Sequence, residues 1–251
     1  MRLDVYLTEK GICKSRTAAQ ALIKSGGVEV CGKVCEKPSA EVDEGMQICV
    51  VGEQLRYVGR GGLKLEKALF EFGIELSGRL CLDIGASTGG FTDCMLQHGA
   101  ARVFAVDVGS GQLDEKLRSD SRVVSLEKTD IRSFSFERWP EAQHGADFIG
   151  TDVSFISLKL IFPHIMRLLK SGGSAVVLIK PQFEAATALC AGKSAIGKNG
   201  VVRDAKIRRK IADELVVFAR ECGFQVMGFT ESPITGGDGN VEYLMYLQKT
   251  V

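Results

Sequence analysis

The sequence lacks any apolar stretch close to the roughly 20 residues that a membrane-spanning helix requires. Its first residues, MRLDVYLTEK, carry charges where a secretory signal would have its apolar segment. We therefore expect no membrane partner and a cytoplasmic location. The chain also has no internal repeats and no low-complexity tracts.

Histidine is scarce, and the cysteines are not spaced as metal ligands. The chain has 3 histidines and 8 cysteines, and no two cysteines have the CxxC spacing that is typical of zinc sites. The closest pair in the sequence is Cys31 and Cys35. Thiols that stay reduced inside the cell fit this pattern better than metal ligands do, so we expect no metal.

Neither sign of charge is in excess. Lysine and arginine number 32 against 31 aspartate and glutamate, which gives a formal net charge of +1. A nearly neutral chain does not by itself indicate nucleic-acid binding. Any contact with RNA must therefore come from local clusters of basic residues.

The first 51 residues predict a small α+β domain. Helical patterns are followed by short alternating runs around Gly32, as in a β-hairpin. The expected elements are helices over 2–10 and 15–25, a hairpin over 28–34 and a closing strand over 46–51. Residues 52–62 are polar and rich in glycine, and we interpret them as a linker to a second domain over 63–251.

The second domain alternates between apolar strand-like runs and helical patterns. Strands are expected near 79–85, 103–106, 123–126, 147–150, 175–179, 224–229 and 242–247. This alternation favours an α/β fold with a parallel, doubly wound sheet of the Rossmann type. The last two strands, joined by a loop over 231–240, are expected to pair antiparallel at one edge.

A glycine-rich loop follows the first of these strands. Its spacing is not GxGxxG and no Lys-Ser/Thr pair follows, so neither a dinucleotide fingerprint nor a P-loop is present. Ligands in such sheets bind beyond the carboxyl ends of the strands, where glycines let the backbone approach closely. The loop residues that we expect at the ligand are Asp83, Gly85, Ala86, Ser87, Thr88, Gly89, Gly90 and Phe91.

Acids end the next two strands as well. Asp107 lies 24 residues after Asp83 and is placed to hold ribose hydroxyls, and Asp130 is placed to accept from an adenine amino group. Acids around a glycine loop without basic residues suit a nucleoside with a positive sulfonium, that is, S-adenosylmethionine. The alternative interpretation is that these acids are helix caps or turn residues.

Four further charged residues predict chemistry at the same edge. Asp152 and Lys180 end the fourth and fifth strands, Glu242 begins the last strand, and Lys64 precedes the sheet. A lysine at the end of an apolar strand is costly unless it is paired or used. The alternative is that Lys180 and Asp152 form a structural ion pair and that Glu242 is a surface acid.

Methyl transfer to a hydroxyl would use these groups. A ribose 2′-hydroxyl is a weak acid and needs a base, and a lysine serves when burial or a neighbouring cation favours its neutral form. Lys180 would be that base and Lys64 the neighbouring cation. Asp152 and Glu242 would orient the two amines and balance their charge.

Seven stretches together resemble a known family. They are 57–65, 83–91, 107–113, 152–158, 180–184, 200–204 and 239–243. The second domain resembles the FtsJ-type 2′-O-ribose methyltransferases, and the whole chain resembles the TlyA family, some of whose members are called hemolysin A. The resemblance implies the catalytic tetrad Lys64, Asp152, Lys180 and Glu242. It also implies ribosomal RNA as the partner, methylated on cytidine ribose.

The first domain resembles the S4-like RNA-binding domain of ribosomal proteins. The matching segments are Arg2–Asp4, Ser15–Arg16, Leu22–Ile23 and Lys37–Ser39. The basic residues expected to contact RNA are Lys10, Lys14, Arg16 and Lys24, with Arg60 ahead of the sheet. A solvated helix face is the alternative for the cluster in the first domain.

Two positions depart from the family pattern. Cys31 stands before Gly32 where asparagine is usual, which puts the standard turn hydrogen bond in doubt, and Gly59 replaces the usual serine before Arg60, which suggests a looser linker.

Three other functions remain as alternatives. A nicotinamide-dependent oxidoreductase would share the fold but lacks its GxGxxG motif. A pore-forming hemolysin would need an amphipathic or apolar insertion segment, which the sequence does not contain. A ribosome-binding protein without catalysis is the third alternative, and the intact set of tetrad candidates argues against it.

Overall fold

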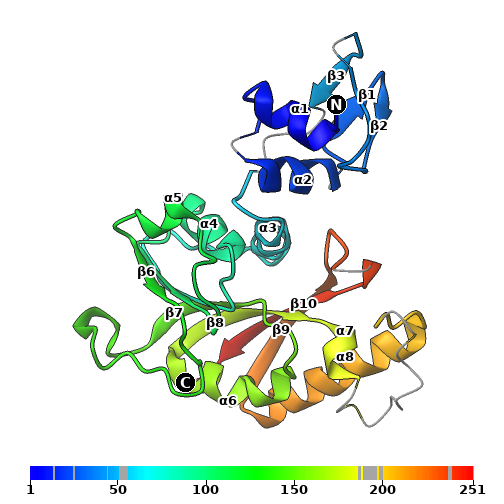
Figure 1. Ribbon diagram of the computed structural model, residues 1–251. Helices are drawn as coiled ribbons and strands as arrows, with labels where there is room; N and C mark the ends of the chain where they lie inside the picture. The colour runs from blue at the N-terminus through cyan, green and yellow to red at the C-terminus, as the bar shows by residue number, and fades with distance from the viewer. Residues whose placement is uncertain are drawn as a thin grey trace. The chain divides into compact units, whose positions relative to one another are not determined.

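The computed structural model describes residues 1–13, 15–24, 26–43, 45–50, 56–185, 188, 197, 200–236 and 239–250. The chain divides into two compact units, Met1–Arg56 and Tyr57–Val251, and each is described by itself (Figure 1). Lys14 and the part of the expected linker over 52–55 lie outside the described residues. None of the described helices is long and apolar enough to cross a membrane.

Unit 1 has two helices and a three-stranded antiparallel sheet in the order β2-β1-β3. Its elements are α1 (Leu3–Glu9), α2 (Arg16–Lys24), β1 (Val28–Val30), β2 (Lys33–Val34) and β3 (Ile48–Val50). The predicted order of two helices, a hairpin and a closing strand is confirmed. Asp4 of α1 is fully buried and accepts hydrogen bonds from Arg2, Arg16 and Gln20, which joins α1 to α2.

The hairpin of unit 1 turns at Cys31 and Gly32. Their φ angles are 51° and 75°, so both residues have the positive φ that a type I′ turn requires. The Cys31 amide donates to the Gln47 carbonyl oxygen at 2.7 Å. The turn therefore forms with cysteine in the left-handed region, at a cost of about 1–2 kcal/mol for a residue with a Cβ.

Unit 2 is built on a seven-stranded sheet in the order β6-β5-β4-β7-β8-β10-β9. The strands are β4 (Leu80–Ile84), β5 (Arg102–Val106), β6 (Val123–Leu126), β7 (Ala146–Thr151), β8 (Leu169–Ile179), β9 (Phe224–Glu231) and β10 (Tyr243–Lys249). β4 to β8 are parallel, which confirms the doubly wound sheet. β9 and β10 pair antiparallel as predicted. β10 lies between β8 and β9, so β9 alone forms the edge on that side of the sheet.

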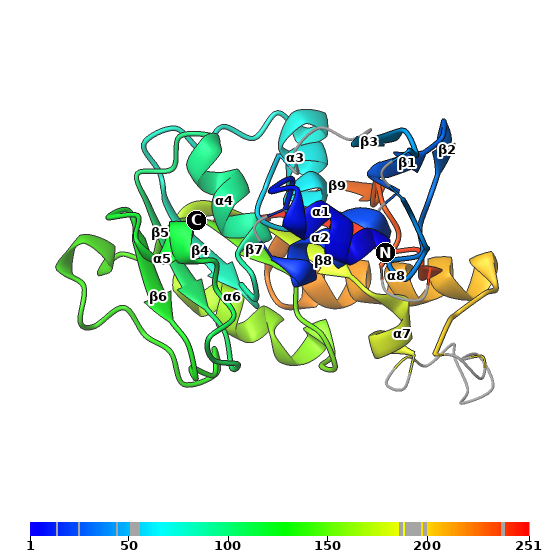
Figure 2. The same ribbon diagram turned by 45° about the horizontal axis from the view of Figure 1, so that its top comes forward.

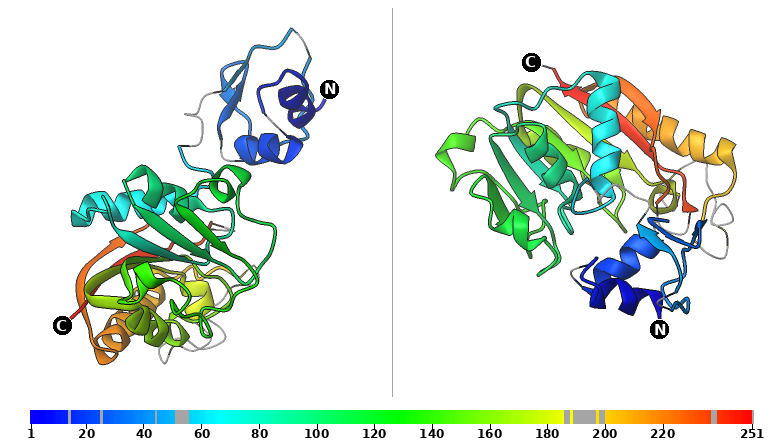
Figure 3. Two further views of the ribbon diagram at one scale, coloured as in Figure 1. Left: turned by 90° about the vertical axis from the view of Figure 1, so that its left-hand side faces the viewer. Right: turned by 90° about the horizontal axis from the view of Figure 1, so that it is seen from above.

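Helices cover both faces of this sheet. α3 (Gly61–Phe72) and α4 (Gly90–Gln97) pack on one face, and α6 (Phe162–Leu168) and α8 (Ala205–Glu221) on the other (Figures 2 and 3). The short elements are α5 (Glu115–Arg118), α7 (Pro181–Glu184), η1 (Pro140–Ala142) and η2 (Leu158–Leu160). The central strands are apolar on both faces because both faces are covered.

The segment from Tyr57 to Gly62 belongs to unit 2. The Tyr57 side chain is buried in the core beneath α3 and α4, and a Cβ at Gly62 would overlap its ring. A Cβ at Gly59 would come within 2.8 Å of Thr88 Oγ1. Residues 57–62 of the expected linker therefore pack against the rest of unit 2, and the suggestion of a looser linker stays a prediction. The domain limits derived from the sequence stay predictions.

Candidate functional site

The order of the strands reverses between β4 and β7, and the candidate site lies at the carboxyl ends of the strands there. The loop after β4 turns sharply into α4, with φ angles of 84° at Gly85 and 98° at Gly89. A Cβ at Gly85 would come within 2.6 Å of the Asp152 carbonyl oxygen. Glycine is therefore needed where the loop approaches the end of β7.

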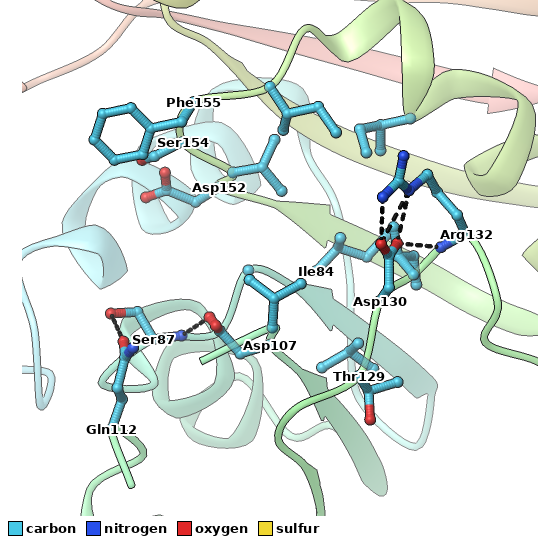
Figure 4. A pocket seen from close by; sticks show the side chains of 17 residues that line it. Ile84, Ser87, Asp107, Gln112, Thr129, Asp130, Arg132, Asp152, Ser154 and Phe155 are labelled. Atoms are coloured by element: carbon cyan, nitrogen blue, oxygen red, sulfur yellow. Dashed lines mark hydrogen bonds and ion pairs between the residues drawn. The ribbon is translucent and has the colours of Figure 1, made fainter. Parts of the chain in front are cut away.

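A cavity of about 480 Å³ opens beside this loop (Figure 4). Its wall includes Ile84, Gly85, Ser87, Asp107, Gln112, Asp130, Asp152 and Phe155. Acidic groups from three strand ends thus share a mostly apolar pocket of a size typical of small-ligand sites. The arrangement suits a nucleoside held by a few oriented polar groups.

Asp107 and Asp130 are both engaged as turn acids. Asp107 accepts from the Ser87 amide at 2.8 Å and from the Gly109 amide at 2.7 Å, which braces the glycine loop. Asp130 forms an ion pair with Arg132 at 2.6 Å, and this hydrogen bond lowers the pKa of Asp130 to about 2. The turn-acid interpretation therefore describes their present contacts, while both residues also line the cavity where a nucleoside was predicted.

Asp83 lies behind the loop and is not on the wall of this cavity. Its side chain is fully buried, and Oδ2 accepts from the Thr92 amide at 2.9 Å and from the Thr92 hydroxyl at 2.6 Å. Burial raises the pKa of Asp83 to about 7. Among the residues that the structure describes, Oδ1 has no hydrogen-bond partner. This acceptor lies beside the glycine loop but away from the cavity wall, so a role of Asp83 toward S-adenosylmethionine stays a prediction.

The rest of the loop faces a second cavity. This cavity measures about 240 Å³, and its wall includes Ala86, Thr88, Gly90, Phe91, Arg60, Asp152 and Lys180. Gly89 lines neither cavity, because the space that its Cβ would take is filled by Leu113 and Leu117. Some residues of the predicted loop thus line the larger cavity, others line the second cavity, and the rest are buried in the protein interior.

Four charged side chains form one continuous series across unit 2. Lys64 Nζ lies 2.7 Å from Glu242 Oε2 and 3.9 Å from Asp152 Oδ2. Lys180 Nζ lies 2.6 Å from Asp152 Oδ1. Glu242 is only 2% exposed, so its interpretation as a surface acid is wrong. The structure brings all four predicted residues together, with Asp152 shared by the two amines.

Two site residues were not assigned a role from the sequence. Ser154 Oγ accepts from Lys180 Nζ at 2.8 Å. Phe155 is 90% exposed at the rim of the larger cavity, has a φ of 63°, and its ring lies 4.8 Å from that of Phe183. No pattern in the sequence indicates that Phe155 is exposed at a cavity, because a phenylalanine beside an apolar strand is more often buried.

The basic residues predicted to contact RNA are exposed where they are described. Lys10, Arg16 and Lys24 lie at the ends of α1 and α2 in unit 1, and Arg16 also donates to the buried Asp4. Arg60 lies in unit 2 on the wall of the second cavity. No group of three potential metal ligands occurs among the described residues.

Known proteins resemble both units. The FtsJ-like methyltransferase family matches residues 57–249, and the S4 domain matches residues 1–48. Hemolysin A of Brachyspira hyodysenteriae is 43% identical over 98% of this chain and 99% of its own length. The 16S/23S rRNA (cytidine-2′-O)-methyltransferase TlyA of Mycobacterium tuberculosis is 41% identical over 98% of this chain and 89% of its own length. A solved structure of a hemolysin-named protein from Streptococcus thermophilus has a TM-score of 0.77 at 45% identity, covering 100% of this chain and 88% of that one.

These matches confirm the resemblance to TlyA proteins, the fold class, and S-adenosylmethionine as the cofactor. They also make the nicotinamide-dependent alternative wrong, because the matched family transfers methyl groups. The chain belongs to the FtsJ-like methyltransferase family and carries an S4 domain at its N-terminus.

Proposed function

We propose that this protein transfers a methyl group from S-adenosylmethionine to the 2′-hydroxyl of a cytidine ribose in ribosomal RNA. The observation that carries the proposal is the series Glu242–Lys64–Asp152–Lys180 beside the cavity at the strand ends. The TlyA relative whose name gives this reaction supports the choice of substrate.

The cofactor, when bound, supplies an electrophilic methyl group, so the protein's part is positioning and proton transfer. Asp107 and Asp130, on the wall of the larger cavity, are groups that would hold it. Lys180 Nζ, on the wall of the second cavity, would take the proton of the 2′-hydroxyl. Asp152 would stabilise the ammonium that forms, and Glu242 balances the charge of Lys64.

The test is a map of 2′-O-methyl groups on ribosomal RNA from cells with and without this protein. We expect a cytidine methyl that disappears in its absence and returns when purified protein and S-adenosylmethionine are added to unmodified ribosomal subunits. Identical maps would contradict the proposal. The same purified system supports the variant measurements below.

Asp107→Ala should weaken cofactor binding. Loss of the carboxylate leaves the Ser87 and Gly109 amides without their acceptor and removes the group proposed to hold the ribose. We expect a loss of about 1–3 kcal/mol, the usual cost of unpaired hydrogen-bonding groups. Calorimetry with S-adenosylmethionine measures it, and Asp120→Ala, which changes an acid lining neither cavity, is the control. Unchanged affinity would remove Asp107 from the site.

Phe155→Ala should weaken RNA binding. The exposed ring at the rim of the larger cavity offers a stacking surface for an unpaired base, and such stacking is worth about 1–3 kcal/mol per base. Phe70→Ala is the matched control, because Phe70 is 91% exposed on α3 and lines neither cavity. Equal RNA affinity of the two variants, measured by filter binding, would show that Phe155 does not contact the RNA.

Residues 1–51 should supply RNA affinity and no chemistry. Deleting them is expected to reduce RNA binding and leave cofactor affinity nearly intact. Within the full chain, reversing Lys10 and Lys24 to glutamate should lower the slope of log affinity against log salt by about 1 for each lost phosphate contact. Lys33→Glu, on β2 of the same unit, is the control. Normal RNA binding by the shortened protein would contradict this role.

A further inference from the structure

One short segment holds the catalytic loop from beginning to end. The segment is Lys180–Glu184, and the loop is Asp152–Leu158. At the start of the loop, Lys180 binds the Asp152 carboxylate and the Ser154 hydroxyl. In the middle, the Phe155 ring packs against Phe183 with their centroids 4.8 Å apart.

Glu184 holds the other end of this loop. It accepts a hydrogen bond from the Ser157 hydroxyl at 2.6 Å and one from the Leu158 amide at 2.8 Å. Its side chain is buried, with 2% of the residue exposed. A buried carboxylate is costly unless hydrogen bonds compensate it, and both of these bonds go to the loop. Glu184 lines neither cavity, so contact with a ligand there does not explain why this position carries an acid.

The loop needs such a restraint. Phe155 has a φ of 63°, and an aromatic residue in this left-handed region is strained. Strained residues persist only where the surrounding structure fixes them. If the loop end were released, the backbone could relax at Phe155 and move the adjoining Asp152, which two lysines share.

We propose that Glu184 is a positioning residue that clamps the Asp152–Leu158 loop onto the Lys180–Glu184 segment. The clamp keeps Asp152 between Lys64 and Lys180 and keeps Phe155 at the rim of the cavity. The inference rests on the proposed function, because turnover is measured as RNA methylation. A displacement of about 1 Å at a catalytic group can cost about 10²-fold in rate.

The test compares Glu184→Ala with Glu184→Gln. Alanine removes both acceptors. Glutamine keeps one oxygen for the Leu158 amide, and its NH₂ can donate to the Ser157 hydroxyl, which rotates to accept. We expect kcat to fall about 10- to 100-fold with alanine, with a rise in the KM for RNA, and glutamine to restore most of the activity. Glu214→Ala is the control, because Glu214 pairs with Lys159, the residue after Leu158, whereas the Ser157 and Leu158 hydrogen bonds go to Glu184.

Two measurements separate a clamp from a general loss of folding. Calorimetry should still count one cofactor site per chain in Glu184→Ala, whereas misfolded protein would lower that count. If Glu184→Ala does not fold, Ser157→Ala removes one of the two bonds and should lower kcat by about 3- to 10-fold, the equivalent of one ordinary hydrogen bond. A near-normal kcat in Glu184→Ala, or in Ser157→Ala if only that variant folds, would overturn the clamp. A kcat as low in Glu184→Gln as in Glu184→Ala would overturn it too.

Hydrogen exchange tests the clamp without reference to methylation. The amides of residues 155–158 should exchange faster in Glu184→Ala than in Glu184→Gln or Glu214→Ala. If the unmodified protein methylated no RNA, the proposed function would fail and this exchange would still decide the clamp. Unchanged exchange in the alanine variant would overturn it.

Discussion

Replacing Lys180 with arginine should lower turnover by about 10²–10⁴, the usual contribution of a general base. Guanidinium keeps the positive charge beside Asp152 but does not lose a proton near neutral pH. Cofactor and RNA should therefore still bind. Single-turnover methylation of ribosomal subunits, with both ligands saturating, measures the loss.

Lys67→Arg is the control for this substitution. Lys67 lies on α3, donates to the Glu231 carbonyl oxygen and lines neither cavity. Lys180→Ala is a poorer test, because it leaves the Asp152 carboxylate without its nearest cation. Near-normal methylation by Lys180→Arg would show that Lys180 only positions groups or balances charge.

The sequence was enough to place the strand-end residues together. Parallel strands bring their carboxyl ends to one edge, so the acids after β5 to β7 and the lysine after β8 were expected at the same edge of the sheet. The position of each side chain at that edge was not predictable in the same way. Asp83 and Asp107 both end strands, but the loop folds over Asp83 and leaves Asp107 on the cavity wall.

Long-range pairs were less accessible to sequence reasoning. Lys64 and Glu242 are 178 residues apart, and their contact depends on α3 packing beside β10. That contact in turn depends on β10 lying between β8 and β9, which alternating patterns alone do not specify. Only the resemblance to a family named both residues together. Whether Glu242 is buried or on the surface also had to come from the structure, because the sequence pattern around it fits both.

The Lys64–Glu242 pair should be the most sensitive point for the stability of unit 2. Glu242→Leu leaves the Lys64 ammonium buried, with Asp152 at 3.9 Å as its nearest remaining acid. Removing one partner of a buried ion pair typically costs about 3–5 kcal/mol in the free energy of unfolding. The fluorescence of Trp139, the chain's one tryptophan, reports the unfolding of this unit in urea.

The double variant Lys64→Met/Glu242→Leu decides what the pair is for. Replacing both charges with apolar groups removes the unpaired ammonium, so most of the lost stability should return. If the pair serves catalysis, turnover should stay low in the double variant even though the protein is stable, because Asp152 has lost its second amine. Recovery of both stability and turnover would make the pair structural, and Lys180 with Asp152 would then suffice for proton transfer. Failure of Glu242→Leu to lower the stability by at least about 1 kcal/mol would contradict the burial argument itself, because a lost hydrogen bond to a charged group alone is worth that much.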